Sequence, residues 1–342
     1  YPARHGGFQR PMGPGWSRAP QFRSAGSGSF AIDSAAKREH GRHDFPLQER
    51  LDEVGMCGIF GVFQTSAVVE WDTACVAAKA LTHRGPDENG EWRDRHAMMF
   101  HRRLSIIDLA LGRQPMVSKD GRHTIIFNGE IYNYKSIKET LQQKGYRFIT
   151  ASDTEIIPAA YDCWGINCLD YFDGMFAFAL WNEKEQQLIL ARDRFGEKPL
   201  YYHADYASRG KFGQFLFASE MKALWAVSVP KNLEGTMMLN YLTLGYVQNP
   251  IKKTATFYSN ILSLPPGHYL TLRPGEGRVQ MKRWYKFETT VSNALEAPGT
   301  YIETFHDLFL QSVENRLNSD VNIGTSLSGG LDSSSIIVAI HS

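Results

Sequence analysis

The sequence predicts an α+β protein in which antiparallel sheets occupy residues 57–265 and a parallel α/β unit occupies residues 301–342. In the first region, short apolar runs such as 175–181 and 187–191 alternate with turn-rich segments and few helices, a pattern typical of antiparallel sheets. In the last region, a helix, an apolar strand, a glycine-rich loop and another helix follow one another, as they do where a parallel sheet opens. Residues 266–300 are expected to link the two regions.

The elements of the first region follow from local sequence patterns. Residues 57–63 alternate small and apolar side chains, as a buried strand does, and residues 71–81 have a helical pattern. An apolar strand is expected at 124–127, and a helix over 134–144 is expected to end at Gly145, because glycine favours a helix C-terminus. Further strands are expected at 175–181, 187–191 and 215–218.

The elements of the second region are a helix, a strand and a second helix. Apolar residues that recur at helical spacing predict the first, amphipathic helix, and they are Phe305, Leu308, Phe309, Val313 and Leu317. Residues 321–327 are expected to form a strand and 328–331 a loop, and a helix is expected from Asp332 onward. This order of elements places the loop at a helix N-terminus.

Composition excludes several classes of protein. Apolar residues make up 43% of the chain, charged residues 21%, and the net charge is +1, so neither nucleic acid nor an anionic membrane is expected as a partner. No apolar run approaches the roughly 18 residues that a membrane-spanning helix needs. The four cysteines do not form a disulfide framework in a chain this long, and no Cys or His pair completes a zinc site beside Cys163 and Cys168. We therefore expect a cytoplasmic protein.

Residues 1–55 differ from the rest of the chain. The first 30 residues are rich in Gly, Pro, Ser and Arg, contain no acidic residue and show no hydrophobic period. Such a segment buries too little apolar surface to offset its ordering entropy, and its glycines and prolines would break the amphipathic helix of a transit peptide. We expect a disordered leader, a pro-segment or translated upstream sequence.

Cys57 is a candidate nucleophile that is activated at a chain terminus. A cysteine attacks as the thiolate, so it needs a base or a lowered pKa. An α-amine, with a pKa of about 8, serves as that base when cysteine is the first residue. Met56 precedes a small residue, as an initiator methionine that is trimmed does, and trimming would leave Cys57 first. The alternative for Cys57 alone is a packed, unreactive thiol.

Three other polar groups fit the same chemistry. Asn128 and Gly129 offer neutral N–H donors for an oxyanion hole at the end of a strand, although Asn-Gly is also a common turn. Arg103 is a candidate clamp for a carboxylate, and Asp153 a candidate partner for an ammonium group. Their alternatives are a solvated arginine and a helix N-cap. Together with Cys57, these groups fit a free amino acid that carries a side-chain amide.

The segment Ser328–Ser334 is a candidate phosphate loop. Its two glycines, Gly329 and Gly330, let the backbone approach an anion, and the following helix presents its N–H groups and dipole to it. No lysine follows, so it is not the nucleotide loop that ends in Gly-Lys-Ser or Gly-Lys-Thr.

Residues 56–342 resemble the glutamine-hydrolysing asparagine synthetases through nine motifs in order. They are MCGIFGVF (56–63), HRGPD (83–87), RRLSIIDL (102–109), FNGEIYN (127–133), SDTE (152–155), DGMFAFALW (173–181), ARDRFGEKPLYY (191–202), FASEMKAL (217–224) and SLSGGLDSS (326–334). Their number and order make the resemblance far more specific than any one short motif.

The resemblance implies a class II glutamine amidotransferase domain at 57–265 with the N-terminal-nucleophile fold, a four-layer α/β/β/α sandwich of antiparallel sheets. Residues 301–342 would be the truncated start of a synthetase domain of the PP-loop ATP pyrophosphatase type. The implied catalytic residues are Cys57, Asn128 and Gly129; the implied glutamine-binding residues are Arg103, Asn128, Glu130 and Asp153; the implied pyrophosphate-binding residues are Ser328, Gly329, Gly330, Leu331, Asp332 and Ser333.

The implied reaction transfers ammonia from glutamine to β-aspartyl-AMP, which is formed from aspartate and ATP with Mg²⁺, and a magnesium ion is expected near Asp332. A homodimer is a further expectation. In this chain the expected activity is limited to the glutaminase half-reaction. Two alternatives stay open: a related PP-loop amidotransferase with a different acceptor, and a catalytically silent chain if the leader is retained.

Overall fold

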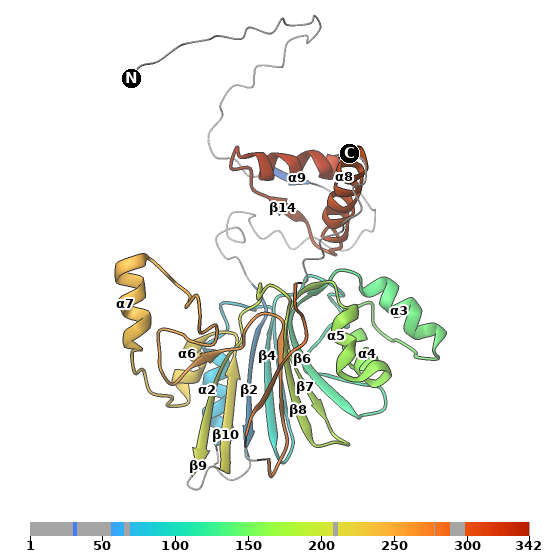
Figure 1. Ribbon diagram of the computed structural model, residues 1–342. Helices are drawn as coiled ribbons and strands as arrows, with labels where there is room; N and C mark the ends of the chain where they lie inside the picture. Colours follow the sequence, from blue (N-terminus) through green and yellow to red (C-terminus); the bar gives the residue numbers. More distant parts are fainter. Residues whose placement is uncertain are drawn as a thin grey trace, which may run out of the picture.

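Two six-stranded antiparallel sheets lie face to face and form the centre of the protein (Figure 1). The computed structural model describes residues 30–32, 56–64, 69–207, 211–276, 278–287 and 298–341. Large side chains from both sheets, such as Phe63 and Phe215 from one and Ile126 and Trp181 from the other, pack into one fully buried cluster. Burial of this apolar surface between the sheets is the main stabilisation of the pair.

The first sheet carries the predicted nucleophile at the start of one of its inner strands. Strands β2 (Gly58–Gln64) and β4 (Ala97–Arg103) are buried along nearly their whole length, and β4 ends in three buried polar residues, His101, Arg102 and Arg103. The edge strand β3 (Glu88–Arg93) alternates between half-buried and exposed residues. The strand order is β11 (Leu262–Ser263), β9 (Tyr201–Ala207), β10 (Lys211–Ala218), β2 (Gly58–Gln64), β4 (Ala97–Arg103) and β3 (Glu88–Arg93).

The second sheet is built around two long strands, β6 (His123–Ile131) and β7 (Gly174–Asn182). Their register pairs Asn128 with Ala177 and Gly129 with Phe176. The strand order is β13 (Gln280–Arg283), β12 (His268–Leu272), β8 (Gln187–Arg192), β7 (Gly174–Asn182), β6 (His123–Ile131) and β5 (Met116–Val117).

Helices cover the outer face of each sheet. On the first sheet lie α2 (Trp71–Lys79) and α6 (Met221–Ala226). On the second lie α3 (Tyr134–Gln143), α4 (Ile156–Trp164) and α5 (Cys168–Tyr171), with the short 3₁₀ helix Gly165–Asn167 between the last two. Helix α7 (Gly235–Leu244) extends from the side of the sandwich (Figure 1). The predicted four-layer α/β/β/α arrangement is confirmed.

Two boundaries differ from the prediction. Strand β6 does not end at Phe127 but continues to Ile131, because β7 pairs with it along its full length; Asn128 and Gly129 therefore lie within a strand rather than at a turn. The predicted linker 266–300 contains β12 and β13, and β12 pairs with β8. The predicted end of the sandwich at residue 265 is therefore too early.

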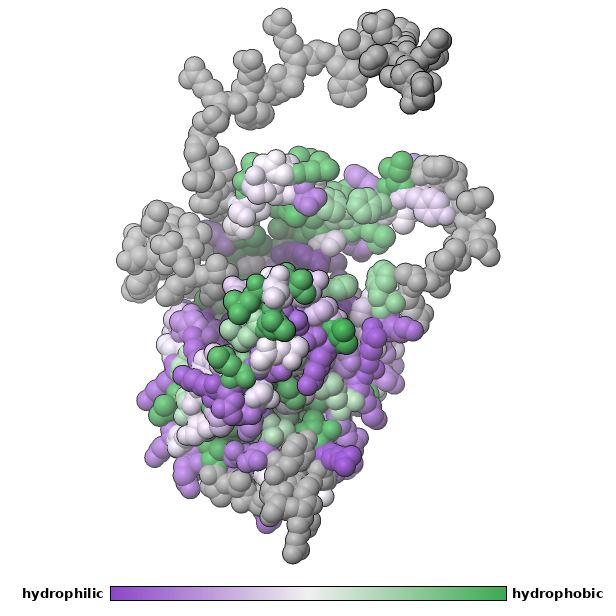
Figure 2. All heavy atoms as spheres, turned by 60° about the vertical axis from the view of Figure 1, so that its left-hand side comes forward, coloured by the Kyte–Doolittle hydropathy of each residue, from purple (hydrophilic) through white to green (hydrophobic). Residues whose placement is uncertain are grey.

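The C-terminal part has the predicted helix–strand–loop–helix order, in α8 (Pro298–Asn315), β14 (Ile323–Thr325) and α9 (Leu331–His341). In the described part of the chain, β14 pairs antiparallel with β1 (Phe30–Ile32). This part lies beyond one end of the sandwich in Figure 1, and Figure 2 shows apolar side chains on its surface. Ile302 and Phe305 of α8 are exposed. No helix among the described residues is long and apolar enough to cross a membrane.

Candidate active site around Cys57

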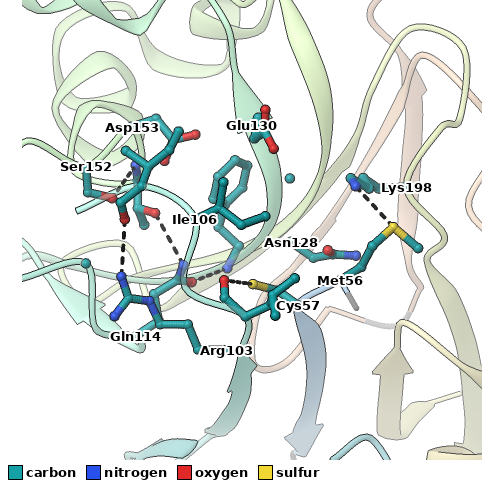
Figure 3. Close-up of a pocket in the computed structure, with 16 residues that line it drawn as sticks. Met56, Cys57, Arg103, Ile106, Gln114, Asn128, Glu130, Ser152, Asp153 and Lys198 are labelled. Carbon is teal, nitrogen blue, oxygen red and sulfur yellow. Dashed lines mark hydrogen bonds between the residues drawn. The ribbon is translucent and has the colours of Figure 1, made fainter. Parts of the chain in front are cut away.

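The pocket around Cys57 lies where the two sheets meet at one end of the sandwich. Cys57 directly precedes β2 of the first sheet, and β6 of the second sheet contributes Asn128, Gly129 and Glu130. The cavity has a volume of about 60 Å³. Its other lining residues are Met56, Arg103, Leu104, Ile106, Ile107, Gly112, Gln114, Phe127, Ser152, Asp153, Thr154 and Lys198 (Figure 3).

The Cys57 thiol makes a hydrogen bond in the pocket and has a raised pKa. Its Sγ donates to the Leu104 carbonyl oxygen at 3.5 Å, and its own carbonyl oxygen accepts a hydrogen bond of 3.1 Å from Arg84 Nε. Burial raises the pKa of the thiol above its ordinary value, while the Leu104 hydrogen bond and the positive charges of Lys198 and Arg103 lower it less. Because the α-nitrogen of Cys57 is in a peptide bond with Met56, no base is available there.

Asn128 offers an unused donor to the pocket. Its side chain is 1% exposed, and among the described residues its Nδ2 has no hydrogen-bond partner. A buried amide N–H without a partner is costly, so its retention in a pocket wall indicates a ligand oxygen that it binds.

The neighbouring Gly129 is fixed by packing. A Cβ at this position would come within 2.2 Å of the Met175 carbonyl oxygen and 2.7 Å of Phe176 Cα. Glycine therefore lets β6 approach β7 closely at a position that lines the pocket. The strand is held on its other side by Gln114, whose Oε1 accepts from Phe127 N at 2.6 Å, and by His101, whose Nε2 is 3.1 Å from Phe127 O.

Two carboxyl groups lie on the pocket wall opposite Met56 and Lys198 (Figure 3). Asp153 is 4% exposed, and its Oδ2 accepts from Ile131 N at 3.0 Å. Burial, to which the negative charge of Glu130 adds, raises the pKa of Asp153 to about 7. Burial also raises the pKa of Glu130, against the opposing charges of Lys198 and Arg316. The pocket therefore gains negative charge as the pH rises through neutrality.

Met56 and Lys198 fill the side of the pocket next to Cys57. Lys198 Nζ donates to Met56 Sδ at 3.2 Å, and Lys198 is 6% exposed. Burial lowers the pKa of Lys198, while the nearby Glu130 and Cys57 raise it less. The ammonium group thus has a thioether for a partner, which is a weak acceptor.

Arg103 lines the pocket, but its terminal nitrogens support the loop that forms the pocket wall. Nη1 donates to Glu88 at 2.9 Å and to Leu109 O at 3.3 Å, and Nη2 donates to the carbonyl oxygens of Ile107 at 3.2 Å and Asp108 at 2.7 Å. A bidentate contact to a carboxylate ligand would require two of these partners to be replaced.

The structure thus brings Cys57, Arg103, Asn128, Glu130 and Asp153 into one pocket, together with Gly129. Among the lining residues that sequence reasoning missed are Gln114 and Lys198. Lys198 lies within the recognised motif ARDRFGEKPLYY, so a signal for it was present. Gln114 lies in a segment without a motif, and only the folded chain places its amide between Phe127 and Thr154.

The predicted phosphate loop lies apart from this pocket, in the C-terminal part. It joins β14 to α9, and Gly329 has a φ of 79°, a conformation that glycine adopts without strain. Ser328 Oγ is 3.0 Å from Ser333 Oγ, and Ser333 Oγ donates to Gly330 O at 3.1 Å. The loop is exposed and leads into a helix of 11 residues, a geometry that suits a phosphate group.

The described residues do not assemble a metal site around Asp332. No group of three or more His, Cys, Asp or Glu side chains in the described ranges is placed to hold a metal ion. Magnesium is usually bound through one or two carboxylates together with substrate phosphates and water, so the Asp332 carboxylate alone does not define a site. The magnesium ion near Asp332 therefore stays a prediction.

The pocket that holds the Cys57 thiol, an amide donor and two carboxyl groups lies within a stretch that matches a known family model. The chain belongs to the glutamine amidotransferase domain family, which matches residues 56–285. The asparagine synthase family matches residues 304–341.

Curated relatives that match three quarters or more of this chain include synthetases and an amidase. The chain is 36% identical to asparagine synthetase [glutamine-hydrolyzing] 1 of Bacillus subtilis, over 82% of this chain and 43% of the relative. It is 35% identical to asparagine synthetase B [glutamine-hydrolyzing] of Escherichia coli, over 83% of this chain and 44% of that relative. It is 35% identical to amidase chry2 of Gibberella zeae, over 75% of this chain and 37% of that relative. The chain thus spans less than half the length of these relatives.

Proposed function

We propose that this chain hydrolyses glutamine at Cys57 once residues 1–56 have been removed. The observation that carries the proposal is the buried, unpartnered Asn128 Nδ2 in the pocket that also holds the Cys57 thiol. A thiol nucleophile attacks a carbonyl carbon, and the oxygen of that carbonyl then needs preorganised donors. The direct experiment is an assay of glutamate and ammonia release from glutamine by the processed protein.

The proposed reaction begins with proton transfer within Cys57. Its free α-amine takes the thiol proton, and the thiolate attacks the side-chain amide carbon of glutamine. Asn128 Nδ2 and Gly129 N–H stabilise the negative oxygen that forms. The protonated amine then gives its proton to the leaving nitrogen, so ammonia departs and a γ-glutamyl thioester remains. Water hydrolyses the thioester to glutamate and restores the thiol.

The other lining residues are proposed to recognise the amino-acid end of glutamine. Glu130 and Asp153 bind the α-ammonium group, because they are the pocket's carboxyl groups and lie together on one wall. Arg103 recognises the α-carboxylate in one of two ways. Its guanidinium binds the carboxylate directly, or it holds the carbonyl oxygens of residues 107–109 and so positions the loop backbone that binds the carboxylate. Removal of Met56 vacates the space beside Lys198 that this substrate requires.

The proposal for the longer protein is a glutamine-dependent asparagine synthetase. The names of the relatives and the asparagine synthase match at 304–341 support it. In that protein, ammonia would pass to β-aspartyl-AMP made from aspartate and ATP, with Ser328, Gly329, Gly330, Leu331, Asp332 and Ser333 on the pyrophosphate and magnesium beside them. The relative named amidase chry2 favours one alternative, a different acceptor for the same ammonia. A homodimer also remains a proposal.

Replacement of Asn128 by alanine should lower kcat for glutamine hydrolysis about 10²- to 10³-fold, because an oxyanion donor acts mainly in the transition state. Steady-state assays of glutamate release by the processed protein check this. Asn182 is a matched control, since it is a buried asparagine at the far end of β7 whose side chain accepts from Glu185 N. Asn182→Ala should leave kcat within about twofold. An unchanged kcat in the Asn128→Ala variant would show that Asn128 does not contribute to the oxyanion hole.

Glutamine should bind more tightly as the pH rises through neutrality. The pKa of Asp153 is raised to about 7, so its carboxylate fraction grows about tenfold from about pH 6 to about pH 8. Isothermal titration calorimetry on the processed Cys57→Ala variant isolates binding from catalysis and should show a roughly tenfold gain in affinity.

The same titrations on a Cys57→Ala, Asp153→Asn double variant provide the control. Its affinity should be lower and nearly independent of pH, because the titrating carboxyl group is gone. A Cys57→Ala protein whose affinity is equal at the two pH values would contradict the assignment of Asp153 to the ammonium group.

A further inference from the structure

The segment 316–320, which joins α8 to β14, contacts the sandwich beside the glutamine pocket. The Arg316 guanidinium lies over the ring of Tyr132 at 4.4 Å from its centroid. Lys135 Nζ donates to Asn318 Oδ1 at 2.6 Å. Tyr132 and Lys135 follow the strand β6 that carries Asn128 and Glu130. The segment therefore contacts, at two points, the residues that directly follow β6.

Asp320 makes the closest connection to the pocket wall. Its Oδ2 accepts from the backbone N–H of Asp108 at 2.7 Å, and its own backbone N–H donates to the carbonyl oxygen of Ile106 at 3.0 Å. One residue of the C-terminal part thus makes hydrogen bonds to two positions of the loop 104–112, Ile106 and Asp108. A carboxylate acceptor makes the first of these bonds stronger than a neutral pair.

The loop that Asp320 holds is a wall of the glutamine pocket. Leu104 O accepts from the Cys57 thiol, and Ile106, Ile107 and Gly112 line the cavity. Asp108 is at the centre of this loop and has a φ of 49°, a left-handed conformation that residues with side chains adopt infrequently. The shape of the wall therefore depends on the hydrogen bonds made to Asp108.

Asp108 also connects this wall to the one that carries Asp153. Its Oδ2 accepts from Ala151 N at 2.7 Å, two residues before Asp153, and its Oδ1 accepts from Leu111 N at 3.0 Å. Its carbonyl oxygen accepts from Arg103 Nη2 and from Gly112 N. Displacement of Asp108 would therefore move the loop, the Arg103 guanidinium and the segment before Asp153 together.

We infer that Asp320 is a positioning residue of the glutamine pocket: it lies outside the amidotransferase domain and holds Ile106 and Asp108 so that the pocket has its binding shape. The inference rests on the proposed function at Cys57. It places part of the glutamine site on the segment that runs on through β14 to the predicted phosphate loop, eight residues after Asp320 at Ser328. Glutamine recognition is then complete only when this segment is docked.

The kinetic test compares Asp320→Ala and Asp320→Asn in the processed protein. Asp320→Ala removes the acceptor for Asp108 N–H, so KM for glutamine should rise about tenfold while kcat stays within about twofold, since Cys57, Asn128 and Gly129 are untouched. Asp320→Asn keeps an oxygen acceptor and should restore most of the loss. Asp307→Ala, which removes an exposed carboxylate from the same C-terminal part, is the matched control and should leave KM unchanged.

Hydrogen–deuterium exchange on the full chain tests the contact without relying on catalysis. Asp320→Ala should speed amide exchange in residues 104–112 about tenfold relative to the parent and to Asp307→Ala. Faster exchange together with a raised KM supports the inference. An unchanged KM in an active protein, or unchanged exchange in that loop, would overturn it. If the parent protein itself does not hydrolyse glutamine, the proposed function fails, and the exchange measurement alone decides whether Asp320 holds the loop.

Discussion

Replacement of Cys57 by alanine should abolish glutamine hydrolysis by the processed protein, with a loss of at least about 10⁴-fold in kcat. The loss is large because the thiol makes the covalent bond to the substrate. The Ser152 hydroxyl, which also lines the pocket, accepts a hydrogen bond from Thr154 N at 3.1 Å and has no base placed to activate it among its hydrogen-bond partners in the described part of the chain. Glutamate release measured by a coupled assay gives the rate.

The protein contains a suitable comparison for this experiment. Cys75 is a half-buried thiol on α2, outside the pocket, with Sγ 3.9 Å from Glu91 Oε2. Its replacement by alanine should leave kcat and KM within about twofold. Binding of glutamine should survive in Cys57→Ala, because the recognition groups Glu130 and Asp153 remain. A Cys57→Ala protein that retains hydrolysis would show that the chemistry takes place elsewhere.

Retention of residues 1–56 should lower the rate of glutamine hydrolysis by about 10²- to 10⁴-fold, the range that general-base catalysis contributes. In the full chain the α-nitrogen of Cys57 is an amide and has no basicity, and burial raises the pKa of the thiol, so the nucleophile stays protonated. The Met56 side chain also occupies the pocket and has Lys198 Nζ as a partner.

One protein preparation can provide both states for this comparison. A protease recognition sequence placed before Cys57, for a protease that leaves Cys57 as the first residue, allows the same sample to be assayed before and after cleavage. Activity should appear with cleavage and should not appear in the cleaved Cys57→Ala protein. Equal activity before and after cleavage would contradict the role of the free amine.

Much of the fold could be predicted because its strands are strongly apolar and locally bounded. The expected strands at 57–63, 175–181 and 187–191 correspond to β2, β7 and β8, which lie in the middle of the sheets. Strands β12 and β13 were missed: β13 is the edge strand of the second sheet and is largely exposed, and β12 lies next to it and has a mixed sequence with only two buried residues. Edge strands bury less apolar surface, so they carry a weaker sequence pattern.

The strand β6 shows that a local residue pair does not by itself predict the backbone conformation. Local chemistry indicated a turn at Asn128-Gly129, since this pair is common in turns. In the structure, pairing with Ala177 and Phe176 of β7 keeps both residues extended. Tertiary pairing therefore overrode a local preference, and the result places the Asn128 amide in the pocket wall, where the proposed chemistry needs it.

The residues proposed to carry the chemistry were easier to predict than the residues proposed to position them. Cys57, Asn128, Glu130 and Asp153 lie in compact motifs, and the structure brings them together. Gln114 and Asp320 act through contacts with Phe127 and Asp108 that are formed only in the folded chain. Single polar residues outside motifs give no local signal of such contacts.

The most direct test of the account is labelling by a glutamine analogue that alkylates thiols, followed by peptide mass spectrometry. The account predicts that the processed protein is labelled at Cys57 alone, that excess glutamine protects it, and that the full chain with residues 1–56 is not labelled at this position. Equal labelling of Cys57 in the full chain, or labelling of Cys75, Cys163 or Cys168 in place of Cys57, would contradict the claim that Cys57 becomes a glutamine-directed nucleophile only at the chain terminus.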